Sequence, residues 1–242
     1  MTKTVPNVPQ SGLFSRASLM DVRQDCVLCD AADVHTLCTP CAAALPRASH
    51  ACPVCATPNQ SGVSVMCGAC VAAPPAIDAA LAAFQYQFPL DRLVQSFKFS
   101  ANLALVDFFA EALAARLRTQ CVSLHGVTLL ALPLANRRLA TRGFNQSALL
   151  ADALGKQLGL QVAHHAMLRI RETPPQSGLS RQARLKNIHG AFECAASLAG
   201  QHIALIDDVM TTGATLSEAA RILKKAGAAK VEAWVLARAV MA

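Results

Sequence analysis

The sequence predicts an α/β fold, in which a parallel β-sheet is flanked by helices and preceded by a small cysteine-rich module. From residue 127 onward, strand-like apolar segments alternate with helical ones, which is the pattern of βαβ units. Hydrophobic residues make up 53% of the 242 residues, enough to build a buried core. Eight of the ten cysteines form four C-x2-C pairs in the first third of the chain. A chain of this length suits one α/β domain with a small appendage.

The individual strands and helices follow from hydrophobic periodicity and from the positions of Pro and Gly. In chain order, the expected elements are a strand at 82–87, helices at 89–97 and 103–118, a strand at 127–133, a basic loop, a helix at 145–158, a strand at 202–206, a helix at 214–226 and a strand at 230–237. Because these strands are expected to be parallel, their carboxyl ends should meet at one edge of the sheet, where open α/β folds bind ligands.

Composition suggests three segments along the chain. We expect a loose tail at residues 1–22, the cysteine-rich module at 23–73 and the α/β domain at 74–242, with the proline-containing stretch 72–76 as a short, stiff linker. The first seven residues lack the apolar core of a signal peptide. The longest apolar stretch, residues 127–135, is too short to span a bilayer. We therefore expect a cytoplasmic protein without a transmembrane segment.

The four C-x2-C pairs have the spacing of zinc knuckles, in which a tight turn directs two thiolates at one tetrahedral ion. The eight cysteines are Cys26, Cys29, Cys38, Cys41, Cys52, Cys55, Cys67 and Cys70. Disulfides are the alternative, but they belong to secreted proteins. We expect two structural zinc ions, each bound by four cysteines. The simplest grouping is sequential, with the first four on one ion, although interleaved pairs would also fit the spacing. A structural zinc contributes an apparent ~10–16 kcal/mol, so folding and metal binding should be coupled.

A second motif lies in the last third of the chain, where four apolar residues, 203–206, precede Asp207 and Asp208. Two adjacent carboxylates can accept hydrogen bonds from vicinal ribose hydroxyls and can hold magnesium. Thr211, Thr212, Gly213, Ala214 and Thr215 follow at the start of a helix. Their N–H groups and hydroxyls, together with the helix dipole, suit a phosphate. The motif therefore predicts a site for 5-phosphoribosyl-1-pyrophosphate (PRPP) with magnesium. The alternative is a strand ending in acids before an ordinary helix start.

These motifs resemble those of type I phosphoribosyltransferases, and more closely those of the bacterial ComF family. The resemblance extends from Cys26 to Arg238. Besides the cysteine pairs and the Asp-Asp loop, it depends on Lys98-Phe99, on Arg137-Arg138 with residues 142–146, and on residues 173–179. It implies a type I phosphoribosyltransferase-like sheet, an N-terminal zinc ribbon and a link to DNA uptake in competence. It also implies that Asp207 and Asp208 bind ribose or magnesium as the catalytic residues, and that Thr211 to Thr215 bind the 5′-phosphate.

The basic loop after the strand at 127–133 occupies the position of the family's pyrophosphate loop. By this resemblance, Arg137, Arg138 and Arg142 would bind phosphate oxygens through their guanidinium groups. The alternative is a solvated basic loop. A second polar and basic segment, residues 169–187, is either a flap that closes over the ligand or a surface loop with a short amphipathic helix.

Two functional hypotheses remain open on the sequence alone. The first is a phosphoribosyltransferase, a glycosyltransferase-class enzyme, with an unidentified acceptor. Thr211 stands where purine-specific relatives commonly carry an acid, so an obvious general base is missing. The second is a non-catalytic adaptor that binds single-stranded DNA or the competence machinery through the zinc module and the basic loops. The net charge of +7 favours a polyanionic partner, whereas a single Trp and a single Tyr leave few rings for base stacking.

Overall fold

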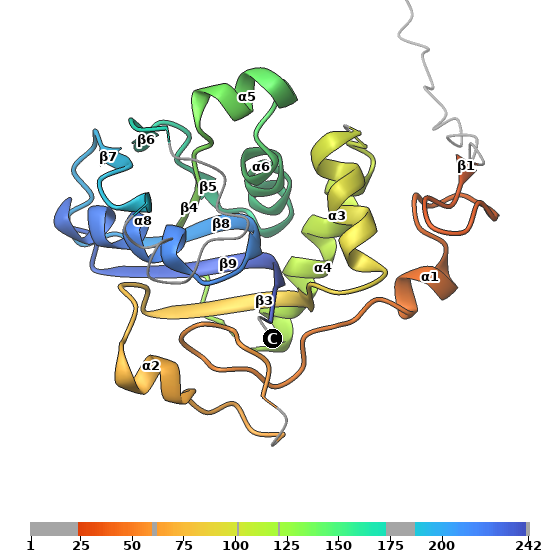
Figure 1. Cartoon of the computed structure of the whole chain (residues 1–242), viewed down its shortest axis with the longest axis horizontal. Coiled ribbons are helices and arrows are strands. Elements are labelled where there is room, and N and C mark those ends of the chain that lie inside the picture. The colour runs from red at the N-terminus through yellow and green to blue at the C-terminus, as the bar shows by residue number, and fades with distance from the viewer. Residues whose placement is uncertain (1–23, 60–61, 101, 121, 173–186, 241–242) are drawn as a thin grey trace, which may run out of the picture.

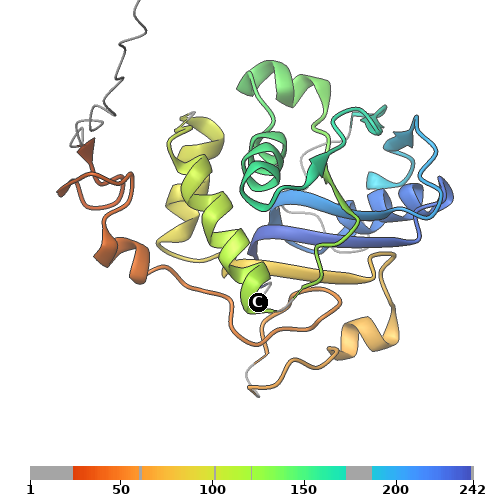
Figure 2. The same cartoon turned by 180° about the vertical axis from the view of Figure 1, so that it is seen from behind.

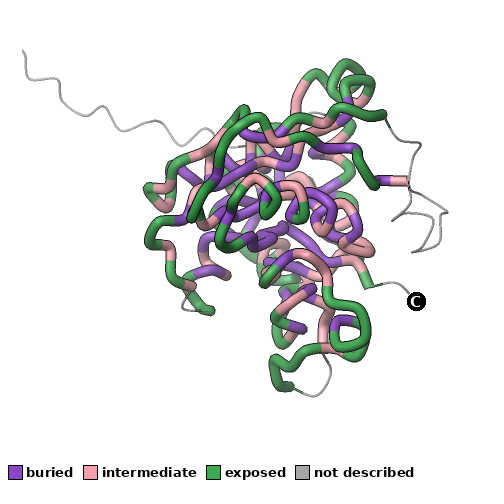
Figure 3. Tube along the Cα trace, turned by 90° about the vertical axis from the view of Figure 1, so that its left-hand side faces the viewer, coloured by how far each residue is buried: buried purple, intermediate pink, exposed green. Residues whose placement is uncertain are grey.

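The computed structural model describes residues 24–59, 62–100, 102–120, 122–172 and 187–240 (Figure 1). Within these ranges, every helix is too short or too polar to cross a lipid bilayer. Buried segments gather in the centre of the molecule and exposed segments surround them (Figure 3).

A parallel sheet of five strands forms the centre of the α/β domain, as the sequence predicts. The strands lie in the order β3-β9-β8-β4-β5, and each neighbouring pair is parallel. Their bounds are β3 Ala79–Gln85, β4 Val127–Ala131, β5 Gln161–Val162, β8 His202–Met210 and β9 Lys230–Arg238. Because both faces of β8 and β9 are covered, most of their residues are apolar.

Helices cover both faces of this sheet (Figures 1 and 2). One face packs against α3 Leu90–Phe99, α4 Leu105–Thr119 and α6 Gln146–Leu158, and the other packs against α8 Ala214–Lys225. The alternation along β8 explains the two cores: Ala204 and Ile206 face the first group of helices, and Ile203 and Leu205 face α8.

Three features differ from the sequence-based expectation. The predicted basic loop is mostly a helix, α5 Asn136–Arg142, which ends at Gly143 in a left-handed conformation (φ 79°). The strand predicted at 202–206 continues through the two acids to Met210, because residues 207, 209 and 210 still pair with β9. A short antiparallel pair, β6 Met167–Arg169 and β7 Phe192–Cys194, was not predicted. The interpretation of the intervening segment as a flap or a surface loop lies largely outside the described residues.

The cysteine-rich segment contains little regular structure: β1 Gln24–Asp25, β2 Ala32–Asp33, α1 Thr39–Ala43 and α2 Gly68–Ala72. Its first half, with α1, lies beside α3 and α4, whereas its second half, with α2, lies beneath β3 (Figures 1 and 2). Residues between the halves bond to β3, since the N–H of Ala48 donates to the carbonyl of Ala83 at 2.9 Å. Both halves therefore pack on the α/β domain and share its cores.

Candidate functional site

The two acids lie at the carboxyl edge of the sheet. The last residue of β4 to pair with β8 is Ala131, opposite Ile206, so beyond that point β8 has a strand only on its β9 side. Asp207 and Asp208 follow Ile206 directly, and Asp208 is only 8% exposed. Polar groups from α3 and α6 occupy the space that β4 leaves open.

Asp207 accepts two hydrogen bonds that hold its carboxylate in place. The hydroxyl of Ser147, in the first turn of α6, donates at 3.0 Å, and the backbone N–H of Asp208 donates at 2.9 Å to the same oxygen. Burial and the neighbouring charge of Asp208 together raise the pKa of Asp207 to about 7, against the opposing effects of Lys98 and these hydrogen bonds. A further cation at this edge would stabilise the ionised form of both acids.

Asp208 is paired with Lys98, the penultimate residue of α3. The Lys98 Nζ lies 3.0 Å from Asp208 Oδ1, and the two side chains are 19% and 11% exposed. The sequence analysis used Lys98 only for the family resemblance and did not predict it as a site residue. No spacing rule could have found it, because α3 and β8 are more than a hundred residues apart.

Arg142 is the predicted arginine that the structure brings closest to this polar cluster. Its guanidinium lies 4.9 Å from the centre of the Phe99 ring, and its Nη1 donates to Gln146 Oε1 at 3.0 Å. Gln146 in turn donates from Nε2 to the carbonyl of Lys98 at 3.5 Å. Burial lowers the pKa of Arg142, whereas the negative charges of Asp208 and Asp207 raise it, so its charge is within electrostatic range of the acids.

The other two predicted arginines lie about one turn earlier on α5. Arg138 is partly buried, and its positive charge lowers the pKa of both Arg142 and Arg169, although burial has the larger effect on each. Arg137 is exposed, and its backbone N–H donates to Glu172 Oε1 at 2.8 Å. The structure therefore groups Arg138 with Arg142, and it places Arg137 on the outer surface of the helix.

The predicted phosphate loop connects β8 to α8. Gly213 precedes the helix with φ 76°, so the turn favours glycine; a Cβ at this position would lie 2.6 Å from the Met210 Cε and would displace the end of that side chain. The N–H of Ala214 donates to the Thr212 hydroxyl at 3.4 Å, a long hydrogen bond that a stronger acceptor could replace. The loop thus follows the two acids directly, at the N-terminus of a twelve-residue helix.

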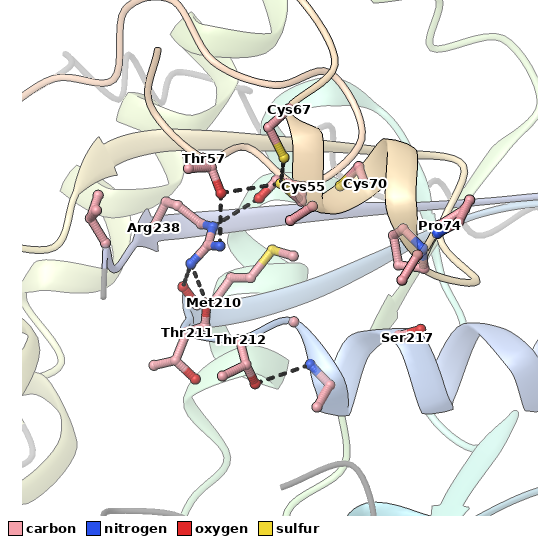
Figure 4. Close-up of a pocket in the computed structure, with 16 residues that line it drawn as sticks. Cys55, Thr57, Cys67, Cys70, Pro74, Met210, Thr211, Thr212, Ser217 and Arg238 are labelled. Atoms are coloured by element: carbon pink, nitrogen blue, oxygen red, sulfur yellow. Dashed lines mark hydrogen bonds between the residues drawn. The ribbon is translucent and has the colours of Figure 1, made fainter. Parts of the chain in front are cut away.

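Arg238, the last residue of β9, holds the opposite side of this loop. Its Nη1 donates to the carbonyls of Met210, at 3.1 Å, and of Thr211. The side chain also reaches the cysteine-rich segment, since Nε donates to the carbonyl of Cys55 at 2.8 Å (Figure 4). The sequence analysis did not predict a role for Arg238, and a lone Arg at the end of an apolar strand offers no signal for one.

The eight paired cysteines form two separate clusters, and the grouping is sequential. The first contains Cys26, Cys29, Cys38 and Cys41, and the second contains Cys52, Cys55, Cys67 and Cys70. Within each cluster, the sulfur atoms all lie within 4.8 Å of one another. This arrangement settles the choice between sequential and interleaved pairs, which the spacing left open.

The donor set of each cluster fits a divalent metal ion. Burial raises the pKa of Cys26, but N–H groups directed at its sulfur outweigh this effect and lower the pKa to about 6. Burial likewise raises the pKa of Cys55, but hydrogen bonds from Thr57 contribute to lowering it to about 7. The neighbouring sulfurs raise the pKa of Cys41, and burial followed by the Cys55 sulfur raises that of Cys70. One thiolate therefore forms easily in each cluster, whereas four need a cation. Four cysteine sulfurs at this separation suit tetrahedral zinc.

Comparisons with known proteins agree with this description. Residues 144–240 match the phosphoribosyl transferase domain family. The DNA utilization protein YhgH of Salmonella typhimurium is 35% identical over 207 residues, which cover 84% of this chain and 90% of that protein. Competence protein F of Haemophilus influenzae is 33% identical over 72% of this chain and 78% of that protein. Competence protein ComFC of Bacillus subtilis is 30% identical over 84% of each.

Among solved structures, a hypoxanthine phosphoribosyltransferase from Staphylococcus aureus matches 57% of this chain and 65% of that chain, at 16% identity. The TM-score of 0.36 is too low to support any inference. The alignments with these three relatives cover most of the chain. The match to the phosphoribosyl transferase domain family lies at residues 144–240. They show that the chain belongs to the ComF family, whose members carry a phosphoribosyltransferase-type domain.

Proposed function

We propose that this chain binds PRPP together with Mg²⁺ at the carboxyl edge of β8, as a phosphoribosyltransferase-like protein that serves DNA utilization or uptake. The observation that carries this proposal is the direct succession of Asp207 and Asp208, the Thr211–Thr215 turn and the N-terminus of α8. The link to DNA comes from the names of the relatives, which are a DNA utilization protein and two competence proteins.

The ribose of PRPP would be held by the two acids. Asp207 and Asp208 can accept hydrogen bonds from vicinal hydroxyls, and their oxygens are the hard ligands that Mg²⁺ prefers. Bound Mg²⁺ would neutralise charge on the pyrophosphate. The 5′-phosphate would lie at the turn, where the helix dipole of α8 and the threonine hydroxyls favour an anion.

The pyrophosphate would meet the cations on the α3 and α5 side of the edge. Arg142 and Arg138 supply guanidinium groups that can bind phosphate oxygens in bidentate fashion. Lys98 now occupies one oxygen of Asp208, so Mg²⁺ and Lys98 compete for the same carboxylate. We expect the ammonium group of Lys98 to turn toward a pyrophosphate oxygen when the ligand binds.

Catalysis, if the bound sugar is transferred, would replace pyrophosphate at C1 of the ribose by an acceptor. These residues would contribute by positioning the ribose and by neutralising the leaving group. Thr211 offers no carboxylate to deprotonate an acceptor, so the acceptor would have to react without a base at that position. The acceptor is unidentified.

A second candidate function is a non-catalytic adaptor for single-stranded DNA or the competence machinery. It is favoured by Phe88 and Phe99, which are 74% and 72% exposed and can stack on bases, and by the exposed Arg137 on α5. We also propose that either function lies in the cytoplasm, because cysteine clusters that bind zinc are kept reduced there. We also propose that residues 23–73 are a double zinc ribbon attached to the domain at 74–242, after a tail at 1–22.

Pyrophosphate release separates the two candidates. The full-length protein is incubated with Mg-PRPP and a panel of nucleobases, nucleosides and oligonucleotides, and released pyrophosphate is measured with an enzyme-coupled assay. Fluorescence anisotropy with a labelled oligo-dT at several salt concentrations measures DNA binding in parallel. Acceptor-dependent release that Asp207→Ala abolishes supports the transferase. DNA binding that survives Asp207→Ala, with neither PRPP binding nor release, contradicts our proposal and favours the adaptor.

A further inference from the structure

Arg238 is a buried cation with acceptors on two different parts of the molecule. It is 8% exposed, and its guanidinium donates to groups of the cysteine-rich segment on one side and of the phosphate loop on the other (Figure 4). The acceptors are the carbonyls of Cys55, Met210, Thr211 and Ala239 and the hydroxyl of Thr57. A buried guanidinium needs such a set of partners, because an unpaired donor would lose its hydration without compensation.

On the cysteine side, these hydrogen bonds reach a metal-ligand sulfur. Arg238 Nη2 donates to the Thr57 hydroxyl at 2.9 Å, and that hydroxyl lies 3.1 Å from the Cys55 Sγ. When Cys55 is a metal-bound thiolate, the Thr57 proton is directed to the sulfur, since its oxygen already accepts from Arg238. The carbonyl of Cys55 accepts from Nε at 2.8 Å. The position of Arg238 therefore depends on the backbone and the sulfur of the same ligand.

On the loop side, the hydrogen bonds fix two peptide groups. The carbonyls of Met210 and Thr211 both point at Nη1. A trans peptide is planar, with its N–H opposite its carbonyl, so this contact directs the N–H groups of Thr211 and Thr212 away from Arg238. These are two of the amides that belong to the proposed phosphate loop. The Met210 carbonyl also accepts from the backbone N–H of Ala239 at 2.9 Å, so a change in the guanidinium position would act chiefly on the Thr211–Thr212 peptide.

A cavity of about 450 Å³ separates the second cysteine cluster from the start of α8 (Figure 4). Cys67, Cys70 and Pro74 line it on the α2 side, and Gly213 and Ser217 line it on the α8 side. The lining residues do not pack against one another across this cavity, so the hydrogen bonds of Arg238 join its two sides, whereas elsewhere both parts share the core on the α8 side. Besides those of Arg238, the N–H of Ala76 donates to the Ser217 hydroxyl at 2.9 Å, and Ser217 lies in the first turn of α8, two residues after Thr215.

From this geometry, and given the proposed PRPP site, we infer that Arg238 is a positioning residue through which metal in the second cluster and phosphate at the Thr211–Thr215 loop stabilise each other. A metal ion holds Cys55 and Thr57 in place, these hold the guanidinium, and the guanidinium orients the loop amides. The coupling is reciprocal, because a ligand that stabilises one arrangement of the chain favours every other contact that requires it. The first cluster lies beside α3 and α4 and takes no part.

The test measures metal retention in each cluster separately. The zinc-loaded full-length protein is mixed with a zinc-selective chelator and iodoacetamide, with and without Mg-PRPP, and alkylation of each cysteine is followed by mass spectrometry. We expect PRPP to slow alkylation in the second cluster by about fivefold or more, the lower end of typical allosteric coupling, and to leave the first cluster unchanged. If calorimetry shows that PRPP binds, equal slowing of both clusters, or of neither, overturns the inference.

Three variants assign the effect to Arg238. Arg238→Lys keeps the charge but lacks the fork of donors, and Thr57→Val removes the hydroxyl at nearly constant volume. Both variants should lose the coupling, so that PRPP slows alkylation of the second cluster by less than about twofold. Ser217→Ala removes the other hydrogen bond across the cavity and should retain the effect. Full coupling in a folded Thr57→Val or Arg238→Lys protein contradicts the role of Arg238.

A ligand-free measurement keeps this inference separate from the proposed function. Hydrogen exchange of a peptide that covers residues 210–213 is compared before and after metal removal, without PRPP. Faster exchange after metal removal in the wild type, with a smaller increase in Thr57→Val, supports the connection between the second cluster and the loop. This holds even if calorimetry finds no PRPP binding, which would contradict the proposed function alone. Unchanged exchange in the wild type overturns the connection whether or not PRPP binds.

Discussion

Lys98 and Asp208 form an ion pair at the carboxyl edge of the sheet, with 3.0 Å between Nζ and Oδ1. The pair joins the end of α3 to the end of β8, and both side chains are largely shielded from solvent. It also means that one of the two acids already has a cationic partner before any ligand binds. The state of this pair decides how readily the edge accepts Mg²⁺.

We predict that Lys98→Met has opposite effects on two affinities. Free Mg²⁺ should bind more tightly, since its competitor for Asp208 is gone, whereas Mg-PRPP should bind about tenfold more weakly, as expected when a charged hydrogen bond is lost. Isothermal titration calorimetry of both ligands checks this. Lys98→Arg, which keeps the charge, is the control and should lie closer to the wild type. Parallel changes in both affinities would contradict the competition between Lys98 and Mg²⁺.

Asp207→Asn should stabilise the protein at high pH. The folded-state pKa of Asp207 is raised to about 7, so the folded state holds its proton more tightly than the unfolded state does. The stability that this proton contributes is complete below the unfolded pKa, near 4, and is lost as the pH rises toward 7. Asparagine has no proton to lose. The variant should therefore gain on the order of 4 kcal/mol over the wild type at pH 8, and little at pH 4.

Urea unfolding at several pH values measures this difference. The gain should follow the titration of one group between pH 4 and 7, and Mg-PRPP binding should be lost in the same variant. Asp107→Asn, at an exposed position on α4, is a control for the loss of one negative charge. A stability difference that does not depend on pH would contradict the raised pKa.

Gly213→Ala should weaken both the fold and the ligand site. Its φ of 76° is strained for alanine, and the added Cβ would lie 2.6 Å from Met210 Cε. We expect a loss of about 1–3 kcal/mol in the free energy of unfolding and at least a tenfold weaker affinity for Mg-PRPP. Gly126→Ala is a matched control, because its φ is 71° but nothing lies within 4 Å of the added Cβ. It should lose stability through the backbone strain and keep its affinity.

The fold and the ligand motifs follow from the sequence because they depend on local patterns. Alternating segments predict the parallel sheet, C-x2-C spacing predicts the clusters, and the succession Asp207-Asp208 to Thr215 predicts the loop. Lys98 and Arg238 could not be found this way, since each acts on residues from distant elements. The helix α5 was predicted as a loop because its seven residues include three arginines and too few apolar residues to show a helical period. The strand β8 was predicted too short, because two acids normally mark the end of a strand, whereas residues 207, 209 and 210 still pair with β9.

Metal removal should lower the stability of the whole chain. Cys26 and Cys38 belong to the core on the α3 and α4 side of the sheet, and Cys52 and Cys70 belong to the core on the α8 side. We expect elemental mass spectrometry of freshly purified protein to find two zinc ions per chain. The protein should unfold at a lower temperature after a chelator has removed the zinc. Protein that is folded and free of metal as purified would contradict this prediction.

The central claim is that the edge formed by Asp207, Asp208 and the Thr211–Thr215 turn binds PRPP with magnesium. Isothermal titration calorimetry of the zinc-loaded full-length protein with PRPP, in the presence and absence of Mg²⁺, tests it most directly. Our account predicts saturable binding that Mg²⁺ strengthens and that Asp208→Asn abolishes. The absence of binding at millimolar PRPP with Mg²⁺, or equal affinity in the wild type and Asp208→Asn, would contradict it.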